Sequence, residues 1–321
     1  MRLRLLDQVR AGCKTVAERA VHVNINTALI PSYAGSLPRA ATTAAAHDAA
    51  CHYLDRGDDT AAFFLTLDAI NFGSGYFPHM KKRPGRSGYF TVAGCLNDHF
   101  KENGPFSATE LIRLNAQDCF RIFEQDPKNK AIAELMQLFT RALNDLGRYV
   151  LADFDGSFSA LIAAAGSSAE RLMNLLIRMP SFCDVGLYDG VKVPFYKRAQ
   201  LAAADLALAF GGKGLGRFDD LDNLTMFADN LVPHVLRMDN ILIYSKVLSA
   251  RIESVDLIPA GSNAEIEIRA CALHAVELLK TALNQSGHAV NSMELDFLLW
   301  NRGQQTAYKA SPRHRTRTVF Y

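Results

Sequence analysis

The stretch TMFADNLVPHVLRMDN, residues 225–240, places a single acid, Asp229, directly before an apolar run, and Pro233 follows four positions later. Proline is tolerated in the first turn of a helix, where backbone N–H groups have no partner within the helix, and aspartate is a common cap at that end. The pattern predicts a helix over about residues 230–239 that Asp229 opens. Capping alone would explain the acid, so the rest of the chain has to show whether it also has a chemical role.

Helical periodicity continues on both sides of this stretch. Ser107 with Glu110 has the spacing of a capping box, as does Asn291 with Glu294. Gly211 is a typical signal for the end of a helix. Apolar residues that recur every three to four positions predict helices over about 107–123, 129–150, 157–178, 195–210, 263–285 and 291–301.

Strand signals are few. VHVNI (21–25) alternates, GYFTV (88–92) is aromatic and β-branched, and VGLYDGVKVPF (185–195) indicates a hairpin around Asp189–Gly190, a pair suited to a type I′ turn. The sequence therefore predicts a mainly α protein with a small β-hairpin or sheet element. We expect one unit over 1–321, with a division into lobes 1–185 and 186–321 and the active site in the cleft between them.

Composition describes an ordinary globular protein. The chain has 321 residues, of which 49% are hydrophobic, and a formal net charge of +2. This excess is too small to indicate a nucleic-acid-binding protein, although basic residues gather at 81–86 and 311–318. Six scattered cysteines without a CxxC pair favour reduced thiols. Since no run approaches the roughly 20 apolar residues of a membrane span, we expect a soluble, cytoplasmic protein without a membrane partner.

Two motifs suggest a cofactor or metal site, but the sequence around each of them does not meet the requirements of such a site. GGKGLG (211–216) follows a helix instead of a strand, and no Ser or Thr follows its lysine, as a phosphate-binding loop requires. HDAACH (47–52) separates its histidines by five positions, which does not match the helical spacing of a zinc site. We therefore expect neither a metal nor a cofactor.

Lys197 and Arg198 stand at the start of the helix predicted over 195–210. Two cations there oppose the helix dipole, and an anionic ligand would remove that cost. A phosphate site is one interpretation of this pair; a surface ion pair with one solvated cation is the other.

The order of these elements resembles the core of the helix-hairpin-helix DNA glycosylases, in which an aspartate opening a helix faces the anomeric carbon of an extruded nucleotide. Here Lys197, the glycines of 211–216 and Asp229 follow in that order. The resemblance implies a two-lobed helical fold. It departs where LDNLTMFA replaces the glycine-rich hairpin that would grip a DNA backbone, and no iron–sulfur quartet follows.

A closer resemblance covers nearly the whole chain. The motifs that carry it are LDAINFGSGYFP (67–78), GYFTV (88–92), FDGSF (154–158), FYKRAQ (195–200), TMFAD (225–229), EIEIRACALHAVE (265–277), LDFLLW (295–300) and the terminal PRHRTRTVFY. With these motifs the sequence is similar to the queuosine salvage family, the queuosine 5′-phosphate N-glycosylases/hydrolases. This resemblance implies hydrolysis of the N-glycosidic bond of queuosine 5′-monophosphate to queuine and ribose 5-phosphate, without a metal or cofactor.

The chemistry of such a reaction agrees with these residues. Cleavage develops positive charge on the sugar, which a fixed carboxylate stabilises; Asp229 is our candidate, as electrostatic stabiliser, base for water or nucleophile. A 7-deazapurine has no N7 to protonate, so its guanine-like edge needs a hydrogen-bonding acid. Asp296 and Trp300 lie four apart on one predicted helix and would offer an acid and an aromatic plane together. Phe227 could stack on the base.

Further candidates line the expected pocket. Asn71 and Tyr76 belong to the glycine-rich turn, and His52 could contact the polar substituent of the base or the phosphate, although a structural role is the simpler interpretation. Glu267 and Arg269 are expected to pair or to support the site. Lys197, together with Arg198, is the candidate for the phosphate.

Two other functions stay open on the residues alone. A DNA or RNA base glycosylase would bind oligonucleotides in a salt-dependent way, which the near-neutral charge does not favour. A non-catalytic protein that binds a modified base would leave Asp229 without a task. The sequence favours a small-molecule substrate and no intact nucleic acid.

Overall fold

The computed structural model describes residues 3–38 and 46–321, and helices account for most of them. Two antiparallel pairs of short strands complete the fold, β1 (Val23–Ile25) with β4 (Leu242–Tyr244) and β2 (Val185–Tyr188) with β3 (Val191–Pro194). The prediction of a mainly α protein with small β elements is confirmed. The helices are α1 (Leu5–Arg19), α2 (Ile30–Ser36), α3 (Asp58–Ala69), α4 (Gly88–Asn103), α5 (Ala108–Arg113), α6 (Ala116–Ile122), α7 (Lys130–Phe154), α8 (Phe158–Ala164), α9 (Ala169–Leu176), α10 (Lys197–Ala209), α11 (Val232–Met238), α12 (Lys246–Glu253), α13 (Asn263–Gln285), α14 (Ser292–Gly303) and α15 (Thr306–Lys309).

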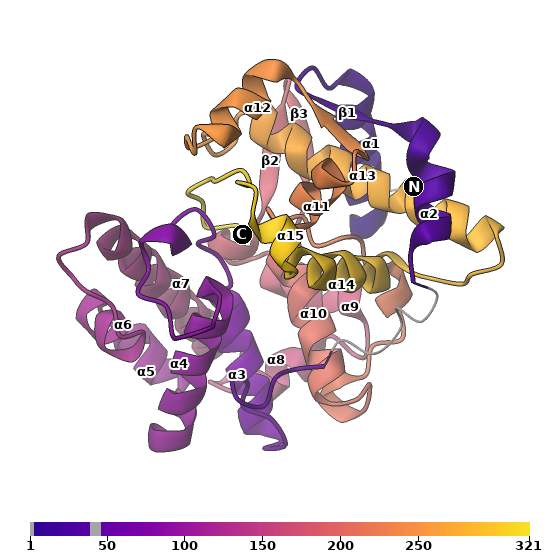
Figure 1. The fold of residues 1–321 in the computed structure, drawn as a ribbon. Helices are drawn as coiled ribbons and strands as arrows, with labels where there is room; N and C mark the ends of the chain where they lie inside the picture. Colours follow the sequence, from indigo (N-terminus) through magenta and orange to yellow (C-terminus); the bar gives the residue numbers. More distant parts are fainter. Residues whose placement is uncertain (1–2, 39–45) are drawn as a thin grey trace.

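The helices gather in two groups. Figure 1 shows α4, α5, α6 and α7 together on one side and α1, α2, α12 and α13 on the other, with α14, α15 and the C-terminal segment between them. The N-terminal helix α1 packs along α13, so the beginning of the chain lies beside its last third. Helix α10 packs on both α3 and α9 and links the groups through the core. The division into lobes at residue 185 stays a prediction.

Capping residues decide where the predicted helices begin and break. The capping boxes of Ser107 with Glu110 and of Asn291 with Glu294 are confirmed. The helix predicted over 107–123 breaks into α5 and α6 because Asn115 starts a second helix with its own capping box. The helix predicted over 157–178 breaks into α8 and α9, where Gly166 takes a φ of +53°, in the left-handed region that ends helices.

One strand prediction is confirmed in detail and one is wrong. Asp189 and Gly190 take φ values of +47° and +80°, as a type I′ hairpin turn requires. GYFTV (88–92) is not a strand but the first turns of α4, since the hydroxyl of Ser87 accepts a hydrogen bond from the backbone N–H of Phe90 and starts a helix there. An N-terminal cap therefore outweighs the β preference of the residues that follow it.

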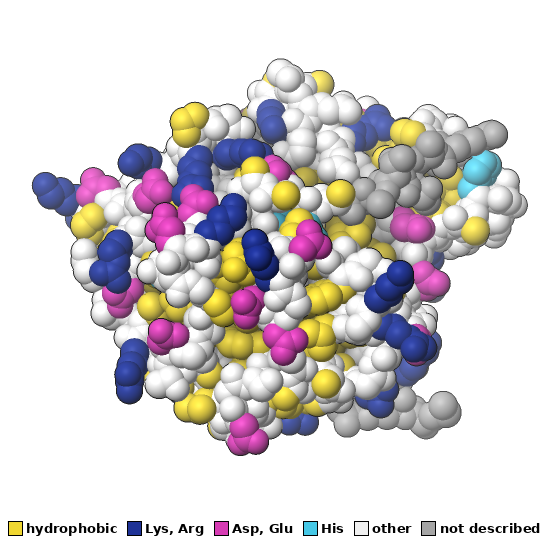
Figure 2. Space-filling model, turned by 90° about the horizontal axis from the view of Figure 1, so that it is seen from below, with side chains coloured by type: hydrophobic (Ala, Val, Ile, Leu, Met, Phe, Trp, Pro, Cys, Tyr) yellow, Lys and Arg dark blue, Asp and Glu magenta, His cyan; other side chains and the backbone are white. Residues whose placement is uncertain are grey.

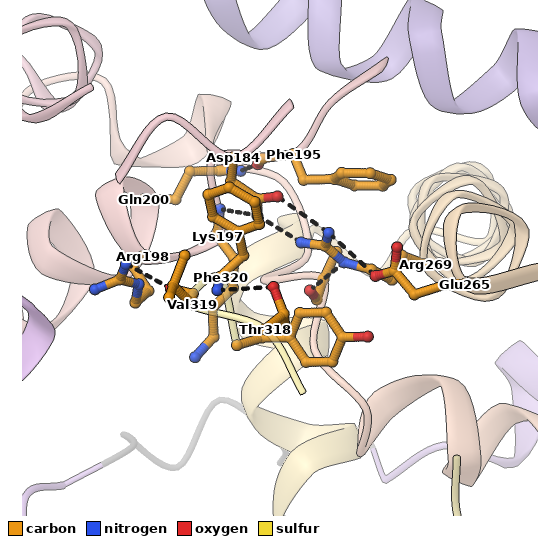
Figure 3. Close-up of polar contacts among 12 residues, drawn as sticks. Asp184, Phe195, Lys197, Arg198, Gln200, Glu265, Arg269, Thr318, Val319 and Phe320 are labelled. Carbon is orange, nitrogen blue, oxygen red and sulfur yellow. Dashed lines mark hydrogen bonds and ion pairs between the residues drawn. The ribbon is translucent and has the colours of Figure 1, made fainter. Parts of the chain in front are cut away.

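A buried ionic cluster joins the hairpin to the long helix α13. Arg269 donates to Asp184 and to Glu265, and its Nε donates to the carbonyl oxygen of Ala228 at 3.0 Å. Figure 3 shows Arg269 between the two carboxylates. All three charged side chains are almost completely inaccessible to solvent. Because Ala228 precedes Asp229, this cluster also fixes the backbone beside the candidate catalytic acid.

The C-terminal segment 313–321 runs through the region between the two groups of helices (Figure 1). The carbonyl oxygen of Val319 accepts a hydrogen bond from Arg198, and that of Tyr321 accepts one from the backbone N–H of Gly73. At Gly75 the segment lies so close that any Cβ would collide with the carbonyl group of Thr316. The lack of a side chain at Gly75 therefore makes room for the segment.

Candidate active site

A cavity of about 570 Å³ lies among α10, α14, the loop before α11 and the C-terminal segment. This volume falls in the range of small-ligand sites. Its polar and charged lining consists of His47, His52, Asn71, Ser74, Lys82, Arg86, Ser87, Lys197, Asp205, Asp229, Asn230, Asp296, Asn301, Gln304, Lys309 and Arg313. Its aromatic lining consists of Phe72, Phe77, Tyr89, Phe90, Phe227, Phe297, Trp300 and Tyr321.

Asp229 lies in this cavity with one of its two carboxylate oxygens fixed. Oδ1 accepts the backbone N–H groups of Leu231 at 2.7 Å and of Val232 at 3.2 Å. The predicted helix begins at Val232, two residues later than expected, and Asp229 holds its first amides from outside the helix. Oδ2 accepts no hydrogen bond from the residues that the structure describes, so it can act on a ligand.

Two cations flank Asp229. Lys197, at the start of α10, is buried, and its Nζ donates to the carbonyl oxygen of Asn71 at 3.3 Å. Burial lowers the pKa of Lys197, and the Asp229 carboxylate is the strongest opposing influence. Burial also lowers the pKa of Arg313, again against Asp229. Asp229 therefore lies between two cationic side chains.

Asp296 faces the same cavity from α14. Its Oδ1 accepts the backbone N–H of Phe227 at 3.0 Å. Burial, together with the charge of Asp229, raises the pKa of Asp296 well above its ordinary range. A carboxyl group that favours its neutral form therefore lies near a second carboxyl group, and pairs of acids in different environments are common in acid–base catalysis.

Aromatic rings surround this pair of acids. Phe227 is buried and packs edge-on against Phe297, with ring centroids 5.9 Å apart. Trp300, one turn after Asp296, packs edge-on against Tyr89 at 6.4 Å and Phe90 at 6.2 Å. The structure brings Phe227, Asp296 and Trp300 to one cavity, as their positions in the sequence suggest.

Two more of the predicted residues line the cavity and one does not. Asn71 and His52 are in the lining, and the Nε2 of His52 lies 3.0 Å from the hydroxyl of Tyr89. Burial and the neighbouring His47 lower the pKa of His52 to about 4, so this ring is neutral at physiological pH. Tyr76 is turned away from the cavity, and its hydroxyl donates to Glu134 on α7.

Arg198 also lies outside the cavity. Its guanidinium donates to the carbonyl oxygens of Asp68, Ala69, Ser181 and Val319 and lies over the ring of Phe72. Figure 3 shows it directed at Val319. Because both terminal nitrogens donate to carbonyl oxygens of the protein, Arg198 ties the C-terminal segment to the core and does not face the cavity where a phosphate would bind.

Of the two alternatives expected for Glu267 and Arg269, pairing with each other is not found. Residues two apart on a helix point to different sides, whereas residues four apart share one, and Arg269 accordingly contacts Glu265. Glu267 accepts the backbone N–H groups of Val21, His22 and Val23 on the other side of α13. Arg269 supports the site through Ala228, while Glu267 holds the N-terminal segment and does not touch the cavity.

Comparison with known proteins shows the family of this chain. The family model described as "Queuosine salvage protein" matches residues 51–321. This chain belongs to that family. It is 36% identical to the queuosine 5′-phosphate N-glycosylase/hydrolase of Sphaerobacter thermophilus over 96% of each chain. It is 34% identical to that of Dictyostelium discoideum over 82% of this chain and 78% of the relative, and 32% identical to that of Mus musculus over 89% and 90%.

In this member of the queuosine salvage family the structure adds residues that the sequence reasoning missed. Lys82 and Arg86, from the basic run 81–86, and Arg313, from the basic run 311–318, meet at the cavity. Both runs are recognisable in the sequence as basic, but the sequence does not show that they lie close together in the folded chain. Asp205 also lines the cavity. The sequence feature that could have pointed to it is its position as a lone acid in the apolar stretch AAADLALAF of α10.

Among residues 3–38 and 46–321, no three His, Cys, Asp or Glu side chains come together as a metal-binding group would. None of the helices in these same ranges is long and apolar enough to cross a membrane.

Proposed function

We propose that this protein hydrolyses the N-glycosidic bond of queuosine 5′-phosphate to queuine and ribose 5-phosphate, with Asp229 at the anomeric carbon. The observation that carries the proposal is how the two oxygens of this carboxylate are hydrogen-bonded. Two backbone amides fix one oxygen, and the other is free in a cavity of nucleotide size whose walls are aromatic. The names of the relatives supply the substrate.

Asp229 stabilises the positive charge that develops on the ribose as the glycosidic bond lengthens. A preorganised carboxylate in a water-poor site stabilises that charge without having to reorient. The same oxygen can take a proton from the attacking water or add to the sugar covalently. In the second case, intact-mass spectrometry of enzyme quenched during turnover would show the added mass of ribose phosphate.

Asp296, Phe227 and Trp300 are proposed to hold the base. A carboxyl group beside the guanine-like edge can accept from the N1–H and the exocyclic amine, or donate to a ring acceptor while it is protonated. Acceptance orients the base, whereas donation by the protonated carboxyl group stabilises the electron pair that the departing base takes with it, since the base cannot be protonated at N7. Phe227, which adjoins Asp296 through its backbone N–H, provides a ring beside that edge.

The phosphate is proposed to lie at Lys82 and Arg313. Burial and the charges of Arg313 and Arg315 lower the pKa of Lys82, which shows that three cations crowd together. None of the three forms an ion pair in the part of the chain that the structure describes. Lys197, by contrast, is surrounded by Asp229, Asp68 and Asp205, which repel a phosphate dianion. Since Arg313 also feels the charge of Asp229, a phosphate there is close to the reacting carbon.

Replacing Lys82 by alanine is expected to lower kcat/KM for queuosine 5′-phosphate about 10-fold, mainly through KM, and to leave hydrolysis of the unphosphorylated nucleoside unchanged. The reason is that Lys82 contacts only the phosphate. Steady-state kinetics on both substrates measures the split. Lys81→Ala, a neighbouring exposed lysine outside the cavity, is the matched control. An equal loss on both substrates would exclude Lys82 from phosphate binding.

The experiment that tests the whole proposal is incubation with queuosine 5′-phosphate, followed by mass spectrometry for free queuine. Tight binding without release of queuine would make the protein a carrier of the modified base. Release of a base from oligonucleotides would make it a nucleic-acid glycosylase. On the face in Figure 2, acidic and basic side chains are interspersed, with hydrophobic groups between them, so that face offers no continuous basic track for a nucleic acid.

A further inference from the structure

Asp68 and Asp205 form a buried pair of carboxyl groups that the reaction at Asp229 does not use. Asp68 lies near the end of α3 and Asp205 in the middle of α10, with 0% and 5% of their surfaces exposed. Their carboxyl groups are within hydrogen-bonding reach of one another. Asp205 lines the cavity while Asp68 does not, so Asp205 stands between the cavity and its partner.

This pair lacks the donors that buried carboxyl groups normally have. Asp68 Oδ1 accepts from the side-chain amide of Asn71 at 3.3 Å, but Asp68 Oδ2 is buried without a conventional donor in the described residues. The side chain of Asp205 receives no N–H group there. His47 Nε2 is 4.0 Å from its Oδ1 and instead lies 3.0 Å from the Asp205 carbonyl oxygen.

The charges around the pair do not balance. Burial raises the pKa of Asp68 well above its ordinary range and that of Asp205 to about 7, so a cation bound beside Asp205 would favour its ionised form. Lys197 is the cation that acts on both, but Asp229 influences it more strongly. The pKa values of His47 and His52 are lowered, so both rings are neutral. In the described residues no Lys or Arg forms an ion pair with either carboxyl group, and the only group within ion-pair distance of Asp205 is the neutral His47 ring at 4.0 Å. A buried carboxylate without a cationic partner is costly.

The position of Asp205 relative to the reaction follows from α10. Lys197, Leu201, Asp205 and Leu208 all line the cavity, with the spacing of one helix face. Asp205 lies two turns beyond Lys197, about 12 Å along the axis at 1.5 Å per residue. A base whose sugar lies at Asp229 and Lys197 can therefore extend a substituent along α10 toward Asp205.

We propose that Asp205, hydrogen-bonded to Asp68, binds the protonated amine in the C7 substituent of queuine. This rests on the proposed function, which supplies a base with an aminomethyl group at C7 whose secondary amine is cationic at neutral pH. The ammonium group donates to Asp205 and provides the counter-ion that the cavity lacks. Guanine has no cation at this place, so guanosine 5′-phosphate leaves the charge unpaired and is rejected.

Three nucleotides test this subsite. Queuosine 5′-phosphate and 7-aminomethyl-7-deazaguanosine 5′-phosphate carry the cation, and 7-cyano-7-deazaguanosine 5′-phosphate does not. Asp205→Asn is expected to lower kcat/KM about 30-fold or more for the two cationic nucleotides and to change that for the cyano nucleotide by less than about 3-fold. Asp68→Asn, which keeps a hydrogen-bond donor toward Asp205, is expected to lose less. Asp219→Asn, an exposed acid, is the matched control.

The outcomes separate this subsite from the proposed function. An equal loss on all three nucleotides would overturn it in favour of a contact to the guanine-like edge, and no loss on any would overturn it outright. If the unaltered protein hydrolyses none of them, the proposed function itself fails. A second measurement does not need a variant: calorimetric titration of the unaltered protein with the free bases should show queuine and the aminomethyl base binding at least about 10-fold more tightly than the cyano base. Equal affinities would overturn the subsite.

Discussion

Asp229→Asn is expected to bind queuosine 5′-phosphate with near-normal affinity and to hydrolyse it about 1000-fold more slowly. The amide oxygen can still accept the backbone N–H groups of Leu231 and Val232, so the loop before α11 keeps its shape. What is lost is the negative charge on the oxygen that faces the ribose. Single-turnover kinetics with detection of queuine measures kcat, and calorimetry with the variant measures binding.

Asp256→Asn is the control for this substitution because Asp256 is exposed and lies outside the cavity. It should retain the kcat of the unaltered protein. A kcat for Asp229→Asn within a few-fold of normal would show that the reacting carbon lies elsewhere. A loss of affinity as large as the loss of turnover would assign Asp229 to substrate binding instead.

The largest loss of stability is expected for Arg269→Ala. The substitution leaves the buried carboxylate of Asp184 without its counter-charge and the carbonyl group of Ala228 without its donor. Breaking a buried ion pair in this way typically lowers the free energy of unfolding by about 3–5 kcal/mol. Urea denaturation followed by circular dichroism measures the change.

Arg217→Ala provides the comparison, since Arg217 pairs with Asp219 at the surface, where both side chains are more than half exposed. Such a pair contributes about 1 kcal/mol or less. If Arg269→Ala were no more destabilising than Arg217→Ala, the cluster at Asp184 would not hold the hairpin to α13.

Features encoded locally could be predicted from the sequence. The capping boxes at Ser107 and Asn291 and the Asp189–Gly190 turn depend on residues within a few positions of one another, and the structure contains all three. The cavity position of Asp296 and Trp300 is of the same kind, because four residues on a helix fix a common face. Local periodicity was therefore sufficient to predict the helices and one wall of the cavity.

Features that depend on contacts between distant segments could not be predicted from the sequence. Nothing near Arg198 in the sequence shows that its guanidinium would meet carbonyl groups from three other parts of the chain. Tyr76 turns toward α7, and Arg313 reaches the cavity, for the same reason. The direction of a side chain in a loop depends on its packing partners, which only the folded chain brings together.

The crossing of the molecule by residues 313–321 bears on how the protein acquires activity. One wall of the cavity comes from residues 46–90 and another from this segment, so the site is closed by contacts between parts of the chain more than two hundred positions apart. Closing so long a loop carries a large entropic cost and belongs to the slow steps of folding. On dilution from denaturant, helical signal should return before hydrolysis does, and a nascent chain should stay inactive until its final segment has docked.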